Sequence, residues 1–274
     1  MSRIGVGTVL AWGVVCALLV APRLFAAEAA QAAAAIAGTV VIDPGHGGAD
    51  LGARGPNGVL EKELTLAVAK RLAKLLRAQG GFEVVLTRTS DAFVALSERT
   101  EIANRSQATL FVSIHANSAP ETEIAGSETY FLSLEASDDE AMRVAMTEND
   151  VFGQEGTADE GADVVGAILG DLIRTEHLRE SSALAAMIQR QLASLPGQSR
   201  GVKQAPFVVL TGVNMPAALV EIGFITNPSE AVRMGQRDRQ DAIAKALAAA
   251  IREAMMQNSS ARLVTEPTPA EEKP

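Results

Sequence analysis

The sequence has almost no cysteine: Cys16 is the only one among 274 residues, and it stands in an apolar N-terminal stretch. The chain beyond that stretch can form no disulfide, and any metal there must be held by nitrogen and oxygen. Aromatic residues are also scarce, at 4% of the chain, so a core must consist of Val, Leu, Ile and Ala. Basic residues are outnumbered by acidic ones, which gives a net charge of −9. Because a phosphate backbone attracts a basic surface, this balance argues against a nucleic-acid partner.

The two ends of the chain have the composition of segments outside a folded domain. Arg3 precedes an apolar run over residues 4–20, and small residues follow Arg23, so we interpret residues 1–27 as a signal peptide for export. An uncleaved anchor is the alternative, because the run approaches membrane-spanning length. Cleavage leaves a mature chain without a membrane span, in the periplasm or cell envelope. We expect residues 28–38 to form a flexible leader and residues 258–274 a disordered tail.

The segment 39–257 is expected to be one α/β domain. Short apolar runs predict strands at 39–43, 83–87, 109–114, 128–132, 207–210 and 217–220. Helical periodicity predicts helices at 62–79, 97–104, 182–195 and 241–255. Strands that alternate with helices indicate a layered domain with helices on both faces of a sheet. An acidic segment at about 136–179, with an amphipathic stretch at 140–149, interrupts this pattern. A connection of that length is usually functional or mobile.

Two of the three histidines directly follow predicted strands. His46 stands in Asp43-Pro44-Gly45-His46-Gly47-Gly48, and His115 follows Val112-Ser113-Ile114. Imidazole together with carboxylate suits Zn²⁺, and Glu61 stands where a glycine-rich loop after His46 meets a helix. Each residue also has an ordinary alternative: a turn histidine for His46, a buried hydrogen-bonded histidine for His115, and a favourable helix-dipole contact for Glu61.

Glu221 lies inside an apolar run, Ala217-Ala218-Leu219-Val220-Glu221-Ile222-Gly223-Phe224. A glutamate in such a run is rarely buried without a partner. One alternative is an ion pair within the core. The other is a general base beside a metal, with a pKa raised by desolvation.

Several blocks in this order resemble the zinc-dependent N-acetylmuramoyl-L-alanine amidases that carry an amidase-3 catalytic domain, and in particular the cell-division amidases. The resemblance spans about residues 39–255. It rests on Ile42-Asp43-Pro44-Gly45-His46-Gly47-Gly48, Glu61-Lys62-Glu63-Leu64, Leu86-Thr87-Arg88, Leu96-Ser97-Glu98-Arg99, Phe111-Val112-Ser113-Ile114-His115-Ala116-Asn117, Arg200-Gly201-Val202-Lys203 and Leu219-Val220-Glu221-Ile222-Gly223-Phe224.

The resemblance implies a twisted, mostly six-stranded sheet flanked by helices. It implies that the metal ligands are His46, Glu61 and His115, that the cofactor is Zn²⁺ and that Glu221 is the catalytic glutamate. The implied reaction is hydrolysis of the amide between N-acetylmuramic acid and L-alanine in peptidoglycan, for wall remodelling and daughter-cell separation. The alternatives are a zinc carboxypeptidase acting on the stem peptide and a non-catalytic regulator that binds peptidoglycan.

The acidic segment resembles an insertion of cell-division amidases in which a helix covers the zinc cleft until a LytM-type activator draws it away. By this resemblance Glu148 is the candidate autoinhibitory residue. An ordinary solvated acidic face is the alternative for Glu148. His177, in a charged helical stretch, is interpreted as a surface histidine and not as a ligand.

Overall fold

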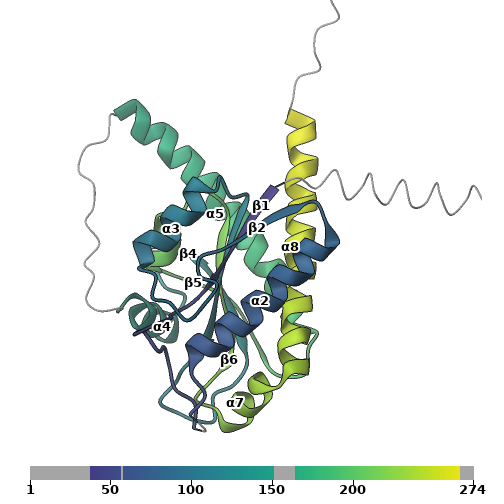
Figure 1. The fold of residues 1–274 in the computed structure, drawn as a ribbon. Coiled ribbons are helices and arrows are strands. Elements are labelled where there is room, and N and C mark those ends of the chain that lie inside the picture. Colours follow the sequence, from purple (N-terminus) through teal and green to yellow (C-terminus); the bar gives the residue numbers. More distant parts are fainter. Residues whose placement is uncertain (1–37, 57, 151–163, 266–274) are drawn as a thin grey trace, which may run out of the picture.

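The computed structural model describes residues 38–56, 58–150 and 164–265 (Figure 1). The predicted signal peptide, residues 28–37 of the predicted leader and residues 266–274 of the predicted tail lie outside the described residues. Gly38, the last residue of the predicted leader, already belongs to the first strand. Within the described ranges, no helix has the length and apolar content needed to cross a bilayer.

The centre of the molecule is a six-stranded mixed sheet with the strand order β2-β1-β3-β6-β4-β5. Its strands are β1 (Gly38–Pro44), β2 (Phe82–Leu86), β3 (Leu110–Asn117), β4 (Ser127–Leu132), β5 (Ser199–Ala205) and β6 (Ala217–Phe224). The strands β2, β1, β3 and β6 run parallel to one another. The pair β4 and β5 runs parallel to each other and antiparallel to β6. The carboxyl ends of β1, β3 and β6 and the amino ends of β4 and β5 therefore meet at one edge of the sheet.

Helices cover both faces of this sheet, as the alternation of elements predicts (Figure 1). One face packs against α2 (Glu61–Gln79), α5 (Val164–Ala193) and α8 (Arg237–Thr265) in the larger apolar cluster, which includes Leu72, Ile188 and Leu247. The other face packs against α3 (Leu96–Arg105), α4 (Asp139–Asn149) and α6 (Val208–Thr211) around Phe111 and Tyr130. The short helix α7 (Pro228–Gly235) follows β6 and contacts it.

The structure corrects three sequence predictions. Residues 207–210 are not a strand; residues 208–211 form α6, because a short apolar run does not distinguish a strand from a buried helical turn. The sixth strand is instead β5, an edge strand whose sequence Ser-Arg-Gly-Val-Lys-Gln-Ala lacks an apolar pattern. Residues 258–265, predicted to be disordered, continue α8, since polar residues such as Asn258 do not by themselves end a helix and the next proline is Pro267.

A buried ion pair joins the strands below the sheet edge. Asp43 at the end of β1 is fully buried and accepts hydrogen bonds from Arg99 at 2.7 Å, from Thr87 at 2.6 Å and from Ser113 at 2.7 Å. Burial raises the pKa of Asp43, but Arg99 and the two hydroxyl donors outweigh burial and hold the pKa below its usual value. Arg99 also donates to the backbone oxygen of His46 at 2.9 Å. The pair thus links β1, β3 and α3 to the loop after β1.

Breaking this pair is expected to destabilise the fold. Asp43→Asn removes the charge that balances the buried Arg99, and such a change costs about 3–5 kcal/mol of unfolding free energy. The matched control, Glu101→Gln, breaks the exposed pair with Arg105 and is expected to cost about 0–1 kcal/mol. Chemical denaturation of both variants measures the difference. A loss for Asp43→Asn no larger than that of the control contradicts the assignment.

Candidate metal centre

Four side chains from four different elements converge at the shared sheet edge. They are His46 after β1, Glu61 at the start of α2, His115 in β3 and Glu148 in α4, and one donor atom of each lies within 4.8 Å of all the others. His46 Nε2 is 3.1 Å from Glu61 Oε1 and 3.2 Å from Glu148 Oε2. His115 Nδ1 is 3.2 Å from Glu61 Oε1 and 2.8 Å from Glu148 Oε2. All four residues are buried.

The donor atoms of this cluster face one another around a common centre. Three of them, His46 Nε2, His115 Nδ1 and Glu148 Oε2, are buried and have no hydrogen-bond partner among the described residues. Buried polar atoms are normally paired, so three unpaired atoms around one point need a ligand. Two imidazoles and two carboxylates are donors that a divalent metal ion accepts. The residues therefore fit a metal ion.

The backbone after β1 is shaped to present His46. His46 has φ 60°, an uncommon conformation for a residue with a side chain, and such strain concentrates at functional sites. Gly52 also has positive φ, and a Cβ there would lie 2.6 Å from the His46 ring and 2.7 Å from Glu61. Position 52 of the loop therefore requires glycine. Asp50 lies 2.9 Å from His46 Nδ1, an arrangement that leaves Nε2 to face the cluster.

Two buried arginines hold the carbonyl groups of this loop. Arg88 donates to the backbone oxygens of Pro44 at 2.9 Å and Gly45 at 2.7 Å. Arg99 donates to the backbone oxygens of Pro44 at 2.8 Å and His46 at 2.9 Å. A guanidinium group offers five donors in a fixed geometry, so it can fix several carbonyls at once. The position of His46 therefore depends on both arginines.

Backbone amide donors fix Glu61, one of the two carboxylates of the cluster. Glu61 Oε1 accepts from the amide of Ala116 at 2.9 Å, and Oε2 accepts from the amide of Ala53 at 2.9 Å. These bonds hold Glu61 between the loop and β3. A Cβ on Gly45 would lie 2.4 Å from His115 Cε1, so a glycine at this position lets the imidazole lie against the backbone of β1.

The carboxylates of the cluster shift the pKa values of the two imidazoles upward. Burial lowers the pKa of His115, but Glu148 and Glu61 outweigh burial and raise it to about 10. The pKa of His46 is likewise raised against burial, by Glu61 and Asp50. Burial raises the pKa of Glu61, yet the two imidazoles outweigh it and the net shift is downward. The two carboxylates thus favour positive charge at the centre of the cluster, which is the charge that a metal ion brings.

Glu221 lies directly opposite His115 on the neighbouring strand β6. It is fully buried, and neither carboxylate oxygen has a hydrogen-bond partner among the described residues. Burial raises the pKa of Glu221 well above its usual value, and the neighbouring Glu148 raises it further. Glu221 does not belong to the four-donor cluster; it stands beside the cluster with a free carboxyl group.

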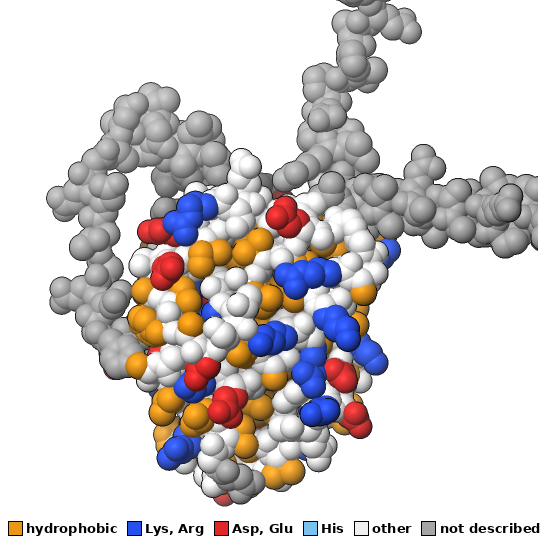
Figure 2. Space-filling view, in the orientation of Figure 1, with side chains coloured by type: hydrophobic (Ala, Val, Ile, Leu, Met, Phe, Trp, Pro, Cys, Tyr) orange, Lys and Arg blue, Asp and Glu red, His pale blue; other side chains and the backbone are white. Residues whose placement is uncertain are grey.

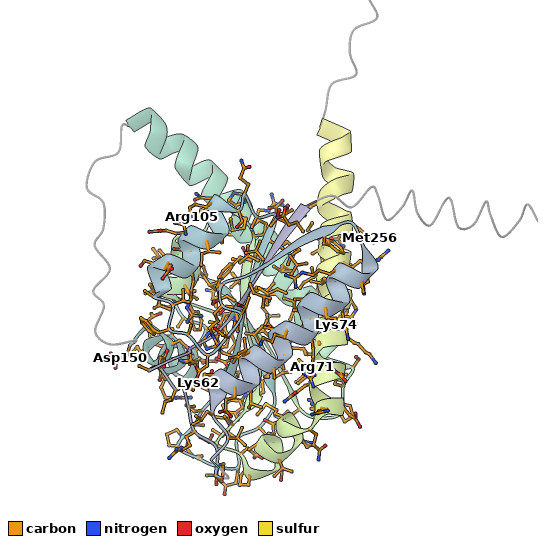
Figure 3. All side chains as sticks on the ribbon, viewed as in Figure 1. Lys62, Arg71, Lys74, Arg105, Asp150 and Met256 are labelled. Atoms are coloured by element: carbon orange, nitrogen blue, oxygen red, sulfur yellow. The ribbon has the colours of Figure 1, made fainter. Side chains whose placement is uncertain are left out.

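Helix α4 lies over the cluster and is fixed at both ends. Asp138 caps its first turn by accepting from the amide of Ala141, and Asn149 bonds to the backbone of Pro206 and Val208. An opening of about 350 Å³ remains beside it, lined by residues that include Glu61, Glu148 and Asp150. Figure 3 labels Lys62 at the start of α2 and Asp150 after the end of α4, the two elements that flank this opening.

The sequence prediction named His46, Glu61, His115 and Glu148, and the structure brings these four together. Glu221 is adjacent, as expected for a group beside the metal. His177 lies on α5, half-buried and 3.6 Å from Glu180, and it does not belong to the cluster. Asp50 has no role in the sequence prediction, although a carboxylate four residues after a candidate histidine ligand can indicate a group that orients that histidine. The sequence prediction also gave no roles to Arg88 and Arg99, whose buried contacts arise only in the fold.

Comparisons with known proteins agree with this geometry. The family model Amidase_3, described as N-acetylmuramoyl-L-alanine amidase, matches residues 40–253. The N-acetylmuramoyl-L-alanine amidase AmiA of Escherichia coli (strain K12) is 37% identical over 213 residues, which cover 76% of this chain and 73% of AmiA. The solved structure of amidase AmiC2 of Nostoc punctiforme is similar with a TM-score of 0.55 and 34% identity, covering 78% of this chain and 95% of that one. An amidase structure from Clostridium difficile 630 gives a TM-score of 0.58 and 29% identity, and the match covers 84% of this chain and 99% of that one.

Loss of the Asp50 carboxylate is expected to weaken metal binding without unfolding the chain. Asp50→Asn removes the charge that orients His46, and changes to such supporting groups cost about 10- to 100-fold in metal affinity. Competition with a chelating dye measures the affinity, and denaturation midpoints verify the fold. The control, Glu121→Gln, changes an exposed carboxylate outside the cluster. Equal affinities for the two variants contradict the role given to Asp50.

Proposed function

The chain belongs to the N-acetylmuramoyl-L-alanine amidase family, and on this premise we propose that zinc held by His46, Glu61 and His115 serves its reaction. The reaction is hydrolysis of the amide that joins N-acetylmuramic acid to L-alanine in peptidoglycan. The observation that carries the proposal is the convergence of unpaired, buried nitrogen and oxygen donors on one point.

The donor spacing supports zinc as the ion. Donors at about 2.0–2.1 Å around a tetrahedral zinc ion lie roughly 3.3 Å from one another. The contacts of Glu61 Oε1 with the two imidazole nitrogens are 3.1 Å and 3.2 Å, close to that spacing. The mature chain offers no thiolate, so the softer metals that depend on sulfur ligands are disfavoured. His46, Glu61 and His115 are the three protein ligands, an arrangement that leaves a fourth position for chemistry.

Bound zinc supplies Lewis-acid chemistry, since it lowers the pKa of water and polarises a carbonyl group. Glu221 supplies the proton transfers. Its carboxylate takes a proton from the attacking water and returns a proton to the amine of L-alanine as that amine leaves. Two observations support this role: Glu221 lies opposite His115, and neither of its oxygens is engaged by another hydrogen-bond donor of the described chain.

The arrangement of α4 supports autoinhibition by Glu148. Glu148 Oε2 is 2.8 Å from His115 Nδ1 and 3.2 Å from His46 Nε2, so it takes the position that a substrate needs. Glu221 has no exposed surface while α4 is in this position. On this proposal the chain is exported to the cell envelope in a blocked state. A LytM-type activator then draws α4 away, and the enzyme acts in wall remodelling and daughter-cell separation.

Digestion of purified sacculi tests the reaction. The zinc-loaded chain is expected to release peptides with free L-alanine amino termini and to leave intact muramic acid, as identified by mass spectrometry. A chelator is expected to abolish release, and added zinc to restore it. Glu221→Gln is expected to retain zinc and lose turnover by several orders of magnitude, because the ligands remain and the base is absent. Cleavage within the stem peptide, or comparable turnover by Glu221→Gln, contradicts the assignment.

Removal of the blocking charge is expected to raise the basal rate. Glu148→Gln loses its attraction to the metal and the imidazoles, so a larger fraction of the chain is open and the rate rises several-fold. Met146→Ala is the matched control, because Met146 is 65% exposed on the same helix. Release of dyed peptidoglycan fragments measures the rate. An unchanged or lower rate in a folded Glu148→Gln chain argues against autoinhibition by this residue.

A further inference from the structure

Two cations on the edge strand β5 are shared by two carboxylates. Arg200 and Lys203 both contact Glu128 Oε1, at 2.8 Å and 2.9 Å, and Glu128 is fully buried in β4. Arg200 also donates to both oxygens of Glu140 on α4, at 2.8 Å and 2.6 Å, and Lys203 lies 3.2 Å from Glu140. Both bonds to Glu140 come from one nitrogen, Nη2, while Nε of the same guanidinium group donates to Glu128, so Arg200 holds two carboxylates with separate nitrogens.

The two cations are fully compensated only while α4 is in place. Glu128 belongs to the sheet and stays with the two cations. Glu140 and Asp138, which lies 3.4 Å from Lys203, belong to the start of α4 and leave with it. One uncompensated positive charge then remains on largely buried side chains, since Arg200 is 20% and Lys203 10% exposed. The guanidinium group of Arg200 keeps its place, because it lies over the Phe224 ring at 5.4 Å.

This cationic pair lies next to the reacting groups. Glu128 is the direct cross-strand partner of Glu221, and paired residues in an antiparallel sheet have Cα atoms about 5 Å apart. The charged groups of Arg200 and Lys203 both contact Glu128, which lies on the strand next to that of the proposed base. In a peptide, successive Cα atoms are about 3.8 Å apart. This length is comparable to the spacing between neighbouring strands, so we expect the second residue after the cleaved amide to lie near the cation pair.

We infer that Arg200 and Lys203 form a carboxylate-binding subsite that receives the free carboxylate of the second residue of the stem peptide once α4 withdraws. The inference rests on the proposed function, because it places the peptide that leaves with L-alanine over β4 and β5. Glu140 occupies the subsite in the closed chain, and its carboxylate stands in for that of the peptide. Helix α4 thus blocks two places at once: Glu148 at the metal cluster and Glu140 at the cation pair.

The competing explanation is that the cations only hold α4 in place. The two explanations differ in their effect on substrate choice. A residue that only holds the helix changes the open fraction, and this changes the rates on all substrates by the same factor. A residue of the subsite changes the ratio between a substrate that carries the carboxylate and one that does not. The ratio of kcat/KM values is therefore the decisive quantity.

The test compares two synthetic substrates whose γ-carboxyl group is amidated in both: the acid N-acetylmuramoyl-L-alanyl-D-glutamine, which has a free α-carboxylate, and N-acetylmuramoyl-L-alanyl-D-glutamine amide, in which an amide replaces that carboxylate. The full-length zinc-loaded chain is expected to favour the acid by on the order of 10- to 100-fold in kcat/KM, the range for a charge-assisted hydrogen bond. Arg200→Lys keeps the charge that balances Glu128 but loses the second donor nitrogen that is free to hold another carboxylate, so the preference falls toward unity. Arg190→Lys, at an exposed pair with Glu253, is the matched control and keeps the preference.

Glu140→Gln weakens the contact that holds α4 but leaves the two cations of the subsite unchanged. It is expected to raise the rates on both substrates and to leave their ratio unchanged. Equal rates on acid and amide in the wild-type chain overturn the subsite while the amidase activity stands. A change in both rates without a change in ratio for Arg200→Lys does the same. If neither substrate is cleaved by the wild-type chain or Glu140→Gln, the proposed function falls together with the subsite.

A binding measurement adds a readout that does not depend on turnover. In Glu140→Ala the contact of Glu140 with the cation pair is removed, and calorimetry compares the acid L-alanyl-D-glutamine, which has a free α-carboxylate, with L-alanyl-D-glutamine amide, which has none. The acid is expected to bind about 10-fold or more tightly, and Arg200→Lys in the same background is expected to remove the difference. Equal affinities for the two dipeptides overturn the inference.

Discussion

The buried ion pair between Asp43 and Arg99 is the interaction on which the metal centre depends. It lies beneath the cluster and joins β1 to β3 through Ser113, and to the loop after β1 through the backbone oxygen of His46. A buried pair of this kind contributes little net stability compared with apolar residues of the same size. Its value here is positional, because the donors of a metal site must be held to within a fraction of an ångström. The strained φ of His46 persists because this network determines the loop from several sides.

Helix α4 is held to the sheet largely by charge. Its buried apolar side chains are small, namely Ala141, Val144 and Ala145, and burial of a valine contributes only about 1.5–3 kcal/mol. Its carboxylates at Glu140 and Glu148 meet cations at one end and the metal cluster at the other. Interactions of this type can be exchanged for those of a substrate or partner with the same charges. The lid can therefore be stable in the resting chain and still be removable. Figure 2 shows a different group of Lys and Arg side chains, exposed on the face that carries α2.

The sequence was sufficient for the parts of the site that carry a local pattern. His46 and His115 directly follow apolar strand runs, and Glu221 interrupts one, so strand periodicity alone directs attention to them. Glu61 needed the family resemblance, because a glutamate at a helix start is ordinarily explained by the helix dipole. Asp50, Arg88 and Arg99 could not be assigned, since their roles depend on backbone oxygens that the fold brings near them. The strand β5 could not be predicted for a related reason: its half-buried Arg200 and buried Lys203 break the apolar pattern, and they pair with Glu128 only in the fold.

The mixed sheet explains how one edge serves both chemistry and recognition. In parallel sheets, ligands bind at the carboxyl ends of the strands, and β1, β3 and β6 follow that rule with His46, His115 and Glu221. Because β4 and β5 run the other way, they bring their amino ends to the same edge. Glu128 and Arg200 are the second residues of those two strands. A parallel continuation would have placed these residues at the opposite edge, far from the base. The reversal of two strands is thus what allows a charged subsite to lie beside the metal centre.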